Sequence, residues 1–462
     1  MTSGAADPQA IPAPADPAAP QPVRPRPLWL RWLGDWWALV ALALFCLFLI
    51  LNVGFEKFLE YLLLGLPQGG IIALIAIGYS MVYGIIQLIN FAHGEIFMFT
   101  AYMMLLFLLP LGGGDAAFAS LQTPSVVFAV LLAGCAAVSV WTLVSDRLRA
   151  LPLRAAVSVA AGVAAGFLFI LCFRMAIPFW IALALVTAFS PVLGITMDTL
   201  AYKPLRHSPR LVPLITAIGM SFMLQNLAQL IFSAQTREIG PTMIPGWLRA
   251  QAPPETTVSW WTALTDYGRV QLFGDLTVPL INVVIVGLAV VMMIGVDTFV
   301  RRSKTGRAMR ACALDQTTAK LVGINVNFTV AMTFAVGSAL AAIAAPFFVI
   351  KYSSIEPTMG YIVGVLAFAS AVLGGIGNIR GAMLGGFAIG IIYNFVPLFE
   401  RLDNWAMIEW LASLPAFADV ENWNKLQGIT QWRLGVAYLF MILVIIFKPT
   451  GLLGQAAASQ RA

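Results

Sequence analysis

The stretch LGLPQGGIIALIAIGYSMVYGIIQLINFAHGEIFMFTAY, residues 64–102, decides how this chain is interpreted. It is apolar enough to cross a bilayer, yet Asn90, His93 and Glu95 lie between its two apolar halves. Polar and ionisable residues at membrane depth are costly, and they usually face a bundle interior or a water-filled cavity. The stretch therefore indicates either a transport path or a structural joint between two membrane helices.

Two interpretations of this polar group, which also includes Gly94, stay open at this stage. In the first, the side chains line a path or brace a gate at a break between helices. In the second, Asn90 caps a helix, Glu95 offsets the N-terminal dipole of that helix, and His93 is hydrogen-bonded near the membrane interface. The two interpretations are compatible, because a fixed helix break can itself serve as the gate.

The composition places most of the chain in a membrane. Hydrophobic residues make up 60% of the 462 positions and charged residues only 10%, whereas a soluble domain carries about 25% charged residues. The net charge of +6 is therefore interpreted as a topology signal and not as a nucleic-acid-binding surface. The four cysteines show no metal-ligand spacing, so neither a metal site nor a cofactor is predicted.

Hydropathy predicts an all-α polytopic membrane protein with about 10–12 transmembrane segments of roughly 20 residues each. The expected segments are residues 36–54, 61–84, 89–111, 125–145, 155–173, 177–198, 211–233, 277–298, 328–350, 361–378, 382–399 and 431–448. Most lysines and arginines fall on alternate connections, and the positive-inside rule then places both termini in the cytoplasm. The Ala- and Pro-rich residues 1–35 are predicted to be a disordered cytoplasmic tail, residues 36–454 the membrane domain, and residues 455–462 a second cytoplasmic tail.

Three connections stand out. Residues 234–276 and 400–430 are rich in tryptophan, and we expect periplasmic loops that lie at the membrane interface or dock an external partner. Residues 299–327 form a long cytoplasmic loop that is basic first and then amphipathic. Its apolar residues fall roughly on one side of a short predicted helix: Ala313, Leu314, Ala319, Leu321 and Val322. Such a helix fits a partner groove or the anionic inner leaflet of the membrane lipid.

A second candidate break is the glycine-rich run LGGIGNIRGAMLGG, residues 373–386. Gly374, Gly375, Gly377 and Asn378 are too densely placed for ordinary helix packing, so the run is interpreted as a turn that joins two helices. Non-helical backbone at membrane depth persists only where protein buries it or where it lines a cavity. The alternative is a tight cytoplasmic turn with no substrate contact.

Catalytic motifs are missing from the sequence. There is no GxxxxGK[ST] phosphate loop, no haem-attachment or zinc pattern and no evident Ser-His-Asp set. The chain is therefore predicted to be a pore or carrier without catalytic residues, and any nucleotide hydrolysis falls to other subunits.

Five blocks, in this order, resemble the permease of branched-chain amino acid ABC transporters, the LivH type. They are GGIIALIAIGYSMVYGIIQLINFAHGE, LITAIGMSFMLQNLAQLIF, RRSKTGRAMRACALDQTTAKLVGIN, AVLGGIGNIRGAMLGG and KPTGLLG. The resemblance implies the importer permease fold with inverted repeats and broken helices, in a bacterial inner membrane. It also implies a LivM-type permease partner, two cytoplasmic ATP-binding subunits and a periplasmic binding protein that delivers leucine, isoleucine or valine.

The resemblance makes residues 299–327 the loop that couples to the ATP-binding subunits. The candidate coupling residues are Arg307, Arg310, Thr317, Thr318, Ala319 and Gly323. Thr317-Thr318-Ala319-x3-Gly323 is similar to the EAA-x3-G motif of importers, although the leading acid is missing. Residues 1–55 extend beyond a typical member, residues 115–175 are an apparent insertion that adds two spans, and the 400–430 loop is longer than usual.

Two other functions stay open. The same machine could carry urea or short amides, since related permeases do so. A stand-alone secondary carrier or channel would need its own coupling-ion site inside the membrane, and His93 and Glu95 are the main titratable candidates for one.

Overall fold

The computed structural model describes most of the membrane domain. The described residues are 47–88, 90–111, 114–144, 151–175, 177–206, 208–209, 211–238, 269–273, 276–400, 413, 429–448 and 450–453. Both predicted tails, most of the two Trp-rich loops and most of the first expected span lie outside these residues. Of that first span, residues 47–53 are described and helical.

Within the described ranges, eight helices are long and apolar enough to cross a membrane, and three shorter apolar helices accompany them. The helices are α2 (Phe55–Ile86), α3 (His93–Leu108), α4 (Gly114–Val144), α5 (Leu151–Arg174), α6 (Phe179–Met197), α7 (Leu211–Phe232), α9 (Leu280–Arg302), α12 (Val326–Tyr352), α13 (Met359–Gly374), α14 (Ile379–Phe395) and α16 (Arg433–Phe447). They match the eleven expected segments that follow the first. The predicted all-α polytopic class is confirmed.

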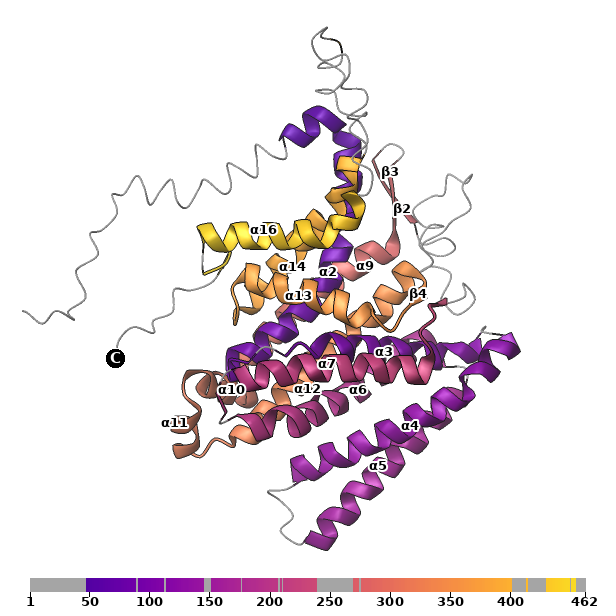
Figure 1. Ribbon diagram of the computed structural model, residues 1–462, viewed down its shortest axis with the longest axis vertical. Coiled ribbons are helices and arrows are strands. Elements are labelled where there is room, and N and C mark those ends of the chain that lie inside the picture. The colour runs from indigo at the N-terminus through magenta and orange to yellow at the C-terminus, as the bar shows by residue number, and fades with distance from the viewer. Residues whose placement is uncertain are drawn as a thin grey trace, which may run out of the picture.

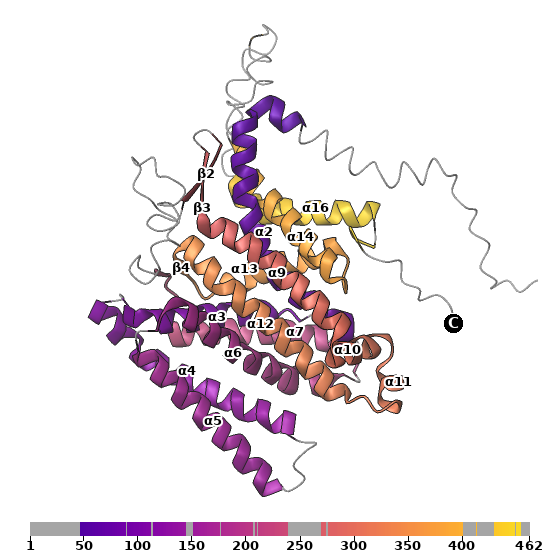
Figure 2. The same ribbon diagram turned by 180° about the vertical axis from the view of Figure 1, so that it is seen from behind.

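The helices run between two ends of the bundle, which Figures 1 and 2 show on opposite sides. At the first, here named the α10 end, lie the short helices α10 (Lys304–Leu314) and α11 (Gln316–Leu321). At the second, the strand end, β1 (Arg237–Glu238) pairs antiparallel with β4 (Ser354–Ile355). β2 (Arg269–Phe273) and β3 (Leu276–Pro279) form a second antiparallel pair at this end. Successive long helices therefore alternate in direction, as spans of one membrane domain must.

Helix α3 is the centre of the bundle. All 16 of its residues are buried, and it packs among α2, α6, α12 and α13. A helix that is apolar all round is stable only when other elements surround it completely. The polar residues at its start therefore lie inside protein and not in lipid.

Helices α2 and α14 cross almost backbone to backbone. A Cβ added at Gly390 would lie 2.2 Å from Gly69 Cα, and one added at Gly386 would lie 2.5 Å from Ala73 Cα. Small residues allow membrane helices to approach this closely, so van der Waals contact between backbones replaces interdigitated side chains. The crossing fixes the position of α2, which leads to the break before α3.

Helices α4 and α5 form a hairpin at the edge of the bundle, in the region predicted to be an insertion (Figure 1). Gly162 and Gly166 of α5 face α4, where a Cβ would meet Ala133 O at 2.6 Å and Ala129 O at 3.1 Å. The outer face of α5 carries exposed valine, leucine, alanine and phenylalanine side chains. An unbroken apolar face of this kind suits contact with lipid.

Replacing Gly390 with Ala tests the α2–α14 crossing. The new methyl group overlaps the backbone of Gly69, and we expect a loss of about 1–3 kcal/mol of folding stability, as for other overpacked sites. The measurement is the melting temperature of the purified chain in detergent micelles. Gly287→Ala is the control, because a Cβ at Gly287 meets nothing within 4 Å. Equal melting temperatures for the two variants would contradict the close crossing.

Candidate functional site

The polar group of residues 90–95 lies at a break between α2 and α3. Helix α2 ends at Ile86, Gln87 takes the left-handed conformation with φ 56°, and α3 begins at His93. The Gln87 N–H still bonds the Tyr83 carbonyl at 2.8 Å, so the helix ends in an ordered cap. A non-glycine residue with positive φ is uncommon, and it marks this junction as a defined feature of the backbone.

Asn90 does not cap α3, contrary to one of the two interpretations of the sequence. The N-cap residue is Ala92, which makes no side-chain capping bond. Asn90 is instead 2% exposed, and its Oδ1 accepts a 2.6 Å hydrogen bond from the hydroxyl of Tyr202. Its Nδ2 has no hydrogen-bond partner among the described residues. Asn90 therefore ties the break to the end of α6, which continues as a π turn, Asp198–Tyr202.

His93 fills a narrow slot between α2 and α12. It is 1% exposed, and the edge of its ring meets Tyr79 with centroids 5.0 Å apart. A Cβ on Gly78 would lie 2.4 Å from His93 Nε2, and one on Gly337 would lie 3.4 Å from Cε1. Nε2 has no partner among the described residues. The imidazole occupies space that the absence of a Cβ at Gly78 leaves free, and it lies at ordinary contact distance from Gly337.

Glu95 and Gly94 connect α3 to two further helices. The Glu95 carboxylate is fully buried, and its Oε1 accepts a 2.8 Å hydrogen bond from Ser221 of α7. Its Oε2 lies against Gly360 of α13 and has no partner among the described residues. A Cβ on Gly94 would lie 2.2 Å from the Gly360 carbonyl oxygen and 2.8 Å from Gly364 Cα. At Gly94 the first turn of α3 therefore meets α13 backbone to backbone, beside the Glu95 carboxylate.

The three polar side chains do not converge on one pocket. Asn90 reaches the end of α6, His93 lies between α2 and α12, and Glu95 reaches α7. Each keeps one buried polar atom that finds no partner among the described residues, and an unpaired buried atom costs about 1–3 kcal/mol. The arrangement braces a joint among several helices at a cost in stability. In the described part of the chain, no group of three His, Cys, Asp or Glu side chains could hold a metal ion.

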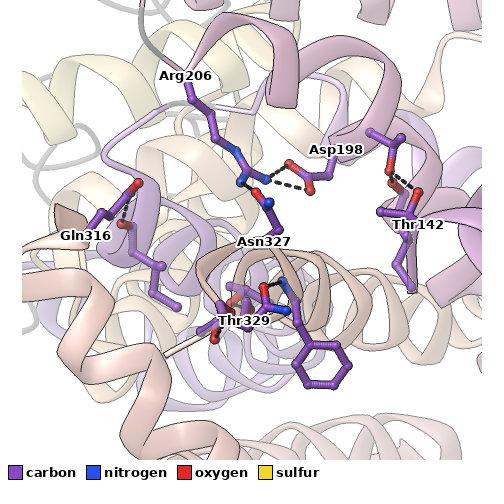
Figure 3. A network of polar contacts seen from close by, with 12 residues as sticks. Thr142, Asp198, Arg206, Gln316, Asn327 and Thr329 are labelled. Carbon is purple, nitrogen blue, oxygen red and sulfur yellow. Dashed lines mark hydrogen bonds and ion pairs between the residues drawn. The ribbon is translucent and has the colours of Figure 1, made fainter. Parts of the chain in front are cut away.

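A second polar network, which the sequence analysis missed, lies at the α10 end (Figure 3). Arg206 donates to both oxygens of the buried Asp198, at 2.7 and 2.8 Å, and also to Asn327 Oδ1 at 2.9 Å. These bonds join the end of α6 to the first turn of α12. The sequence did contain a signal for this network: a lone aspartate, Asp198, at the end of an apolar run, with Arg206 eight residues later.

One hydrogen bond links α11 to the break. Gln316 Nε2 donates to the carbonyl oxygen of Ile85 at 3.2 Å, across 231 positions of sequence (Figure 3). Ile85 lies in the last turn of α2, two residues before Gln87. The first residue of α11 therefore holds the helix end that leads into the joint.

The predicted coupling loop folds as two helices and not as one amphipathic helix. Asp315 ends α10 and caps α11, where it accepts bonds from the N–H groups of Thr317 and Thr318 and from the Thr318 hydroxyl. These bonds, the Thr318 hydroxyl first, hold the pKa of Asp315 below its ordinary value of 3.8. The cap is therefore present above pH 4 and is lost as the carboxylate protonates at lower pH.

The candidate coupling residues differ in exposure. Arg307, Arg310, Thr317 and Thr318 are exposed, whereas Ala319 is 3% exposed and faces the bundle. Gly323 ends the segment with φ +86° and open space around it. Three large apolar side chains stand out from the surface, with the exposed fractions Leu314 91%, Leu321 83% and Val322 70%. Exposed apolar groups at this place fit either a partner groove or the membrane surface, the two alternatives that the sequence leaves open.

The glycine-rich run forms a tight turn between α13 and α14 at the α10 end. Gly374 is the last residue of α13, Gly375 and Gly377 have positive φ, and Asn378 caps α14 through Oδ1. The turn is held from two sides, because Gly377 N donates to Ser80 Oγ and Asn378 Nδ2 donates to the Leu453 carbonyl. This geometry favours the alternative in which the run is a structural turn.

Comparison with known proteins places this architecture in a family. The family model described as the branched-chain amino acid transport system permease component matches residues 155–445. This chain belongs to that family. The match covers α5 to most of α16, including the α10–α11 segment and the α13–α14 turn.

Relatives extend the similarity to most of the permease. The BraD permease of the high-affinity branched-chain amino acid transport system of Pseudomonas aeruginosa is 32% identical, over 86% of this chain and 96% of its own length. The LivH permease of Escherichia coli is 31% identical, over 87% of this chain and 97% of its own. The ribose import permease RbsC of Haemophilus influenzae is 30% identical over only 22% of this chain. No solved structure matches the chain.

The Asp198–Arg206 pair provides a test of the second network in this permease. We expect Arg206→Gln to cost about 3–5 kcal/mol, because it leaves the buried Asp198 carboxylate without its counter-charge. The double variant Asp198→Asn/Arg206→Gln removes both charges and should recover much of that loss. Thermal unfolding of the purified chain in detergent measures both. If Arg206→Gln were as stable as the unmodified chain, the buried Asp198–Arg206 pair would not stabilise this end of the bundle.

Proposed function

We propose that this chain is the permease subunit of an ATP-binding-cassette importer that moves leucine, isoleucine and valine across a bacterial inner membrane. A related LivM-type permease, two cytoplasmic ATP-binding subunits and a periplasmic binding protein complete the machine. The α10 end then faces the cytoplasm and the strand end the periplasm. Family membership and the names of the BraD and LivH relatives support this assignment.

The observation that carries the proposed mechanism is the Gln316–Ile85 hydrogen bond. Helices α10 and α11 expose three large apolar side chains at their surface, and α11 is bonded to the last turn of α2. An ATP-binding subunit that grips this surface therefore pulls on the helix end beside the break. Movement at the α10 end reaches the α2–α3 joint through one helical turn.

The joint converts that movement into alternating access. Asn90, His93 and Glu95 brace the break against neighbouring helices, and the contact of Gly94 with Gly360 lets α3 and α13 separate without unlocking side chains. Partner-free polar atoms lower the cost of leaving this conformation, since other arrangements can pair them. Gly374, Gly375, Gly377 and Asn378 act here as a rigid turn and not as a second gate.

A stand-alone secondary carrier is the second candidate function. Its coupling site would use His93 and Glu95, the titratable pair that the sequence offers. Their polar atoms face different helices, and the described residues bring no further acid or base to them. The geometry therefore favours the ATP-driven machine.

Replacing Leu321 with Asp tests the docking surface. We expect the ATP-binding subunits to be lost from the purified complex and uptake to fall with them, because the charge replaces an apolar contact. The membrane fold should be unchanged, since the side chain is exposed. Leu321→Met is the matched control and should retain both subunits and uptake. Complete recovery of the ATP-binding subunits with Leu321→Asp would contradict the proposed docking surface.

Substitution of Gly323 tests the coupling segment, because it changes which backbone conformations this position can adopt. Gly323→Val should uncouple ATP hydrolysis from uptake, because the left-handed conformation costs an L-residue roughly 1–2 kcal/mol and the turn into α12 shifts. Gly323→Asn is the control, because asparagine tolerates that conformation. The measurement is the ratio of ATP hydrolysed to leucine transported in proteoliposomes. Equal ratios for the two variants would count against a coupling role for this turn.

A further inference from the structure

Helix α7 has an unusual distribution of side chains. Within the chain it buries mainly small residues or residues near its ends, namely Pro213, Ala217, Ser221, Ala228, Ile231 and Phe232. Three of its large apolar side chains, Ile215, Phe222 and Leu230, are more than half exposed. Met220, Leu224 and Leu227 instead pack partly against the bundle. Figure 1 shows α7 on the near face with no other helix in front of it, and Figure 2 places it on the far side. A side of α7 that carries large apolar side chains is therefore uncovered.

The same face carries groups that do not suit lipid. Asn226 is exposed, and its Nδ2 bonds back to the Phe222 carbonyl at 2.7 Å, which leaves the amide oxygen outward. The residue lies six positions before the end of α7, so it is about 9 Å inside the helix at 1.5 Å per residue. Acyl chains offer no hydrogen bond to such an amide, whereas a neighbouring helix can.

Gly219 lies on this face two turns before Asn226. A Cβ placed there would meet nothing within 4 Å, so nothing in this chain requires a glycine at that position. Ile215, Gly219, Phe222, Asn226 and Leu230 follow one another at intervals of three or four residues, which places them on one side of the helix. A small residue and an amide on one exposed side are what close helix–helix contact in a membrane requires.

Helix α5 provides the internal contrast. Its exposed residues between positions 156 and 171 are all alanine, valine, leucine or phenylalanine, with no amide or hydroxyl among them. Both helices therefore present an outer face at membrane depth, but only that of α7 combines an amide with an uncovered glycine. The α5 face suits lipid, and the α7 face suits protein.

We infer that the outer face of α7 packs on a membrane helix of the partner permease subunit, an inference that rests on the proposed function. The partner helix places a large apolar side chain over Gly219 and a hydrogen-bonding side chain opposite Asn226. The inner face of α7 holds Glu95 through Ser221, so α7 lies between the partner subunit and the α2–α3 joint. A shift of either permease against the other then moves the first turn of α3.

Photochemical crosslinking tests the occupant of this face. A benzoylphenylalanine replaces Phe222 on α7 or, as the matched control, the exposed Phe167 on α5, in cell membranes that contain the whole transporter. We expect position 222 to yield an adduct with the partner permease, identified by mass spectrometry, and position 167 to yield none. Adducts from position 222 with lipid only, or with a second copy of this chain, would overturn the inference.

Two matched glycine substitutions distinguish a defect in assembly from a defect in folding. Gly219→Leu fills the proposed contact, whereas Gly134→Leu adds the same side chain to an exposed site on α4 where a Cβ also meets nothing. Both variants should melt at the temperature of the unmodified chain. Only Gly219→Leu should lower the amount of partner permease that co-purifies with the tagged chain, by several-fold. Equal recovery of the partner with both variants would overturn the inference.

Uptake in the same cells distinguishes the two proposals. If branched-chain amino acid uptake requires the ATP-binding subunits but position 222 gives no adduct with the partner, the α7 contact is wrong and the proposed function stands. If the partner adduct forms but uptake does not require those subunits, the contact stands and the proposed function is wrong.

Discussion

The complete burial of α3 is the constraint on which the rest of this structure depends. A membrane-buried helix with Asn90, His93 and Glu95 at its start is tolerable only if protein surrounds it, because hydrocarbon offers no partner to polar groups. The surrounding helices meet this requirement by approaching very closely. Glycines at the contacts of α3 with α2, α12 and α13 make that approach possible.

These close contacts also determine how the molecule can move. In the proposed mechanism, helices whose backbones touch at glycines shift against each other as rigid bodies. The contact through which a partner would move this joint lies at the α10 end, where Gln316 of α11 bonds the last turn of α2. Arg206, which is paired with Asp198, also bonds Asn327 and so holds the neighbouring ends of α6 and α12 together. In the proposed mechanism, these contacts pass a force applied to α10 and α11 to the break.

Much of the fold follows from the sequence because spans of about 20 apolar residues can satisfy their backbone only as helices. The eleven apolar helices among the described residues correspond to expected segments for this reason. The family could also be recognised from the sequence, because motifs such as NFAHGE and LGGIGNIRG are long and occur in the expected order. The division of the coupling segment at Asp315 had a visible signal, since aspartate is a favoured N-cap residue, but the apolar pattern led to a prediction of one helix.

The site was harder to predict because its contacts join residues far apart in sequence. The residue type of Asn90 suggested a helix cap. Its side-chain oxygen instead accepts a hydrogen bond from the hydroxyl of Tyr202, which lies 112 positions away in the sequence. Ser221 and Gln316 carried no local signal for their bonds to Glu95 and Ile85. The position of His93 depends on the absence of a side chain at Gly78, and a glycine of this kind is indistinguishable in sequence from an ordinary packing glycine.

The most direct test of the central claim is uptake by the purified complex in proteoliposomes, with labelled leucine, isoleucine, valine and urea offered in turn. We expect uptake of the branched-chain amino acids that requires ATP, the ATP-binding subunits and the binding protein, with little uptake of urea. Leucine uptake that persists after the ATP-binding subunits are removed would contradict the account, because α10 and α11 would then have nothing to transmit.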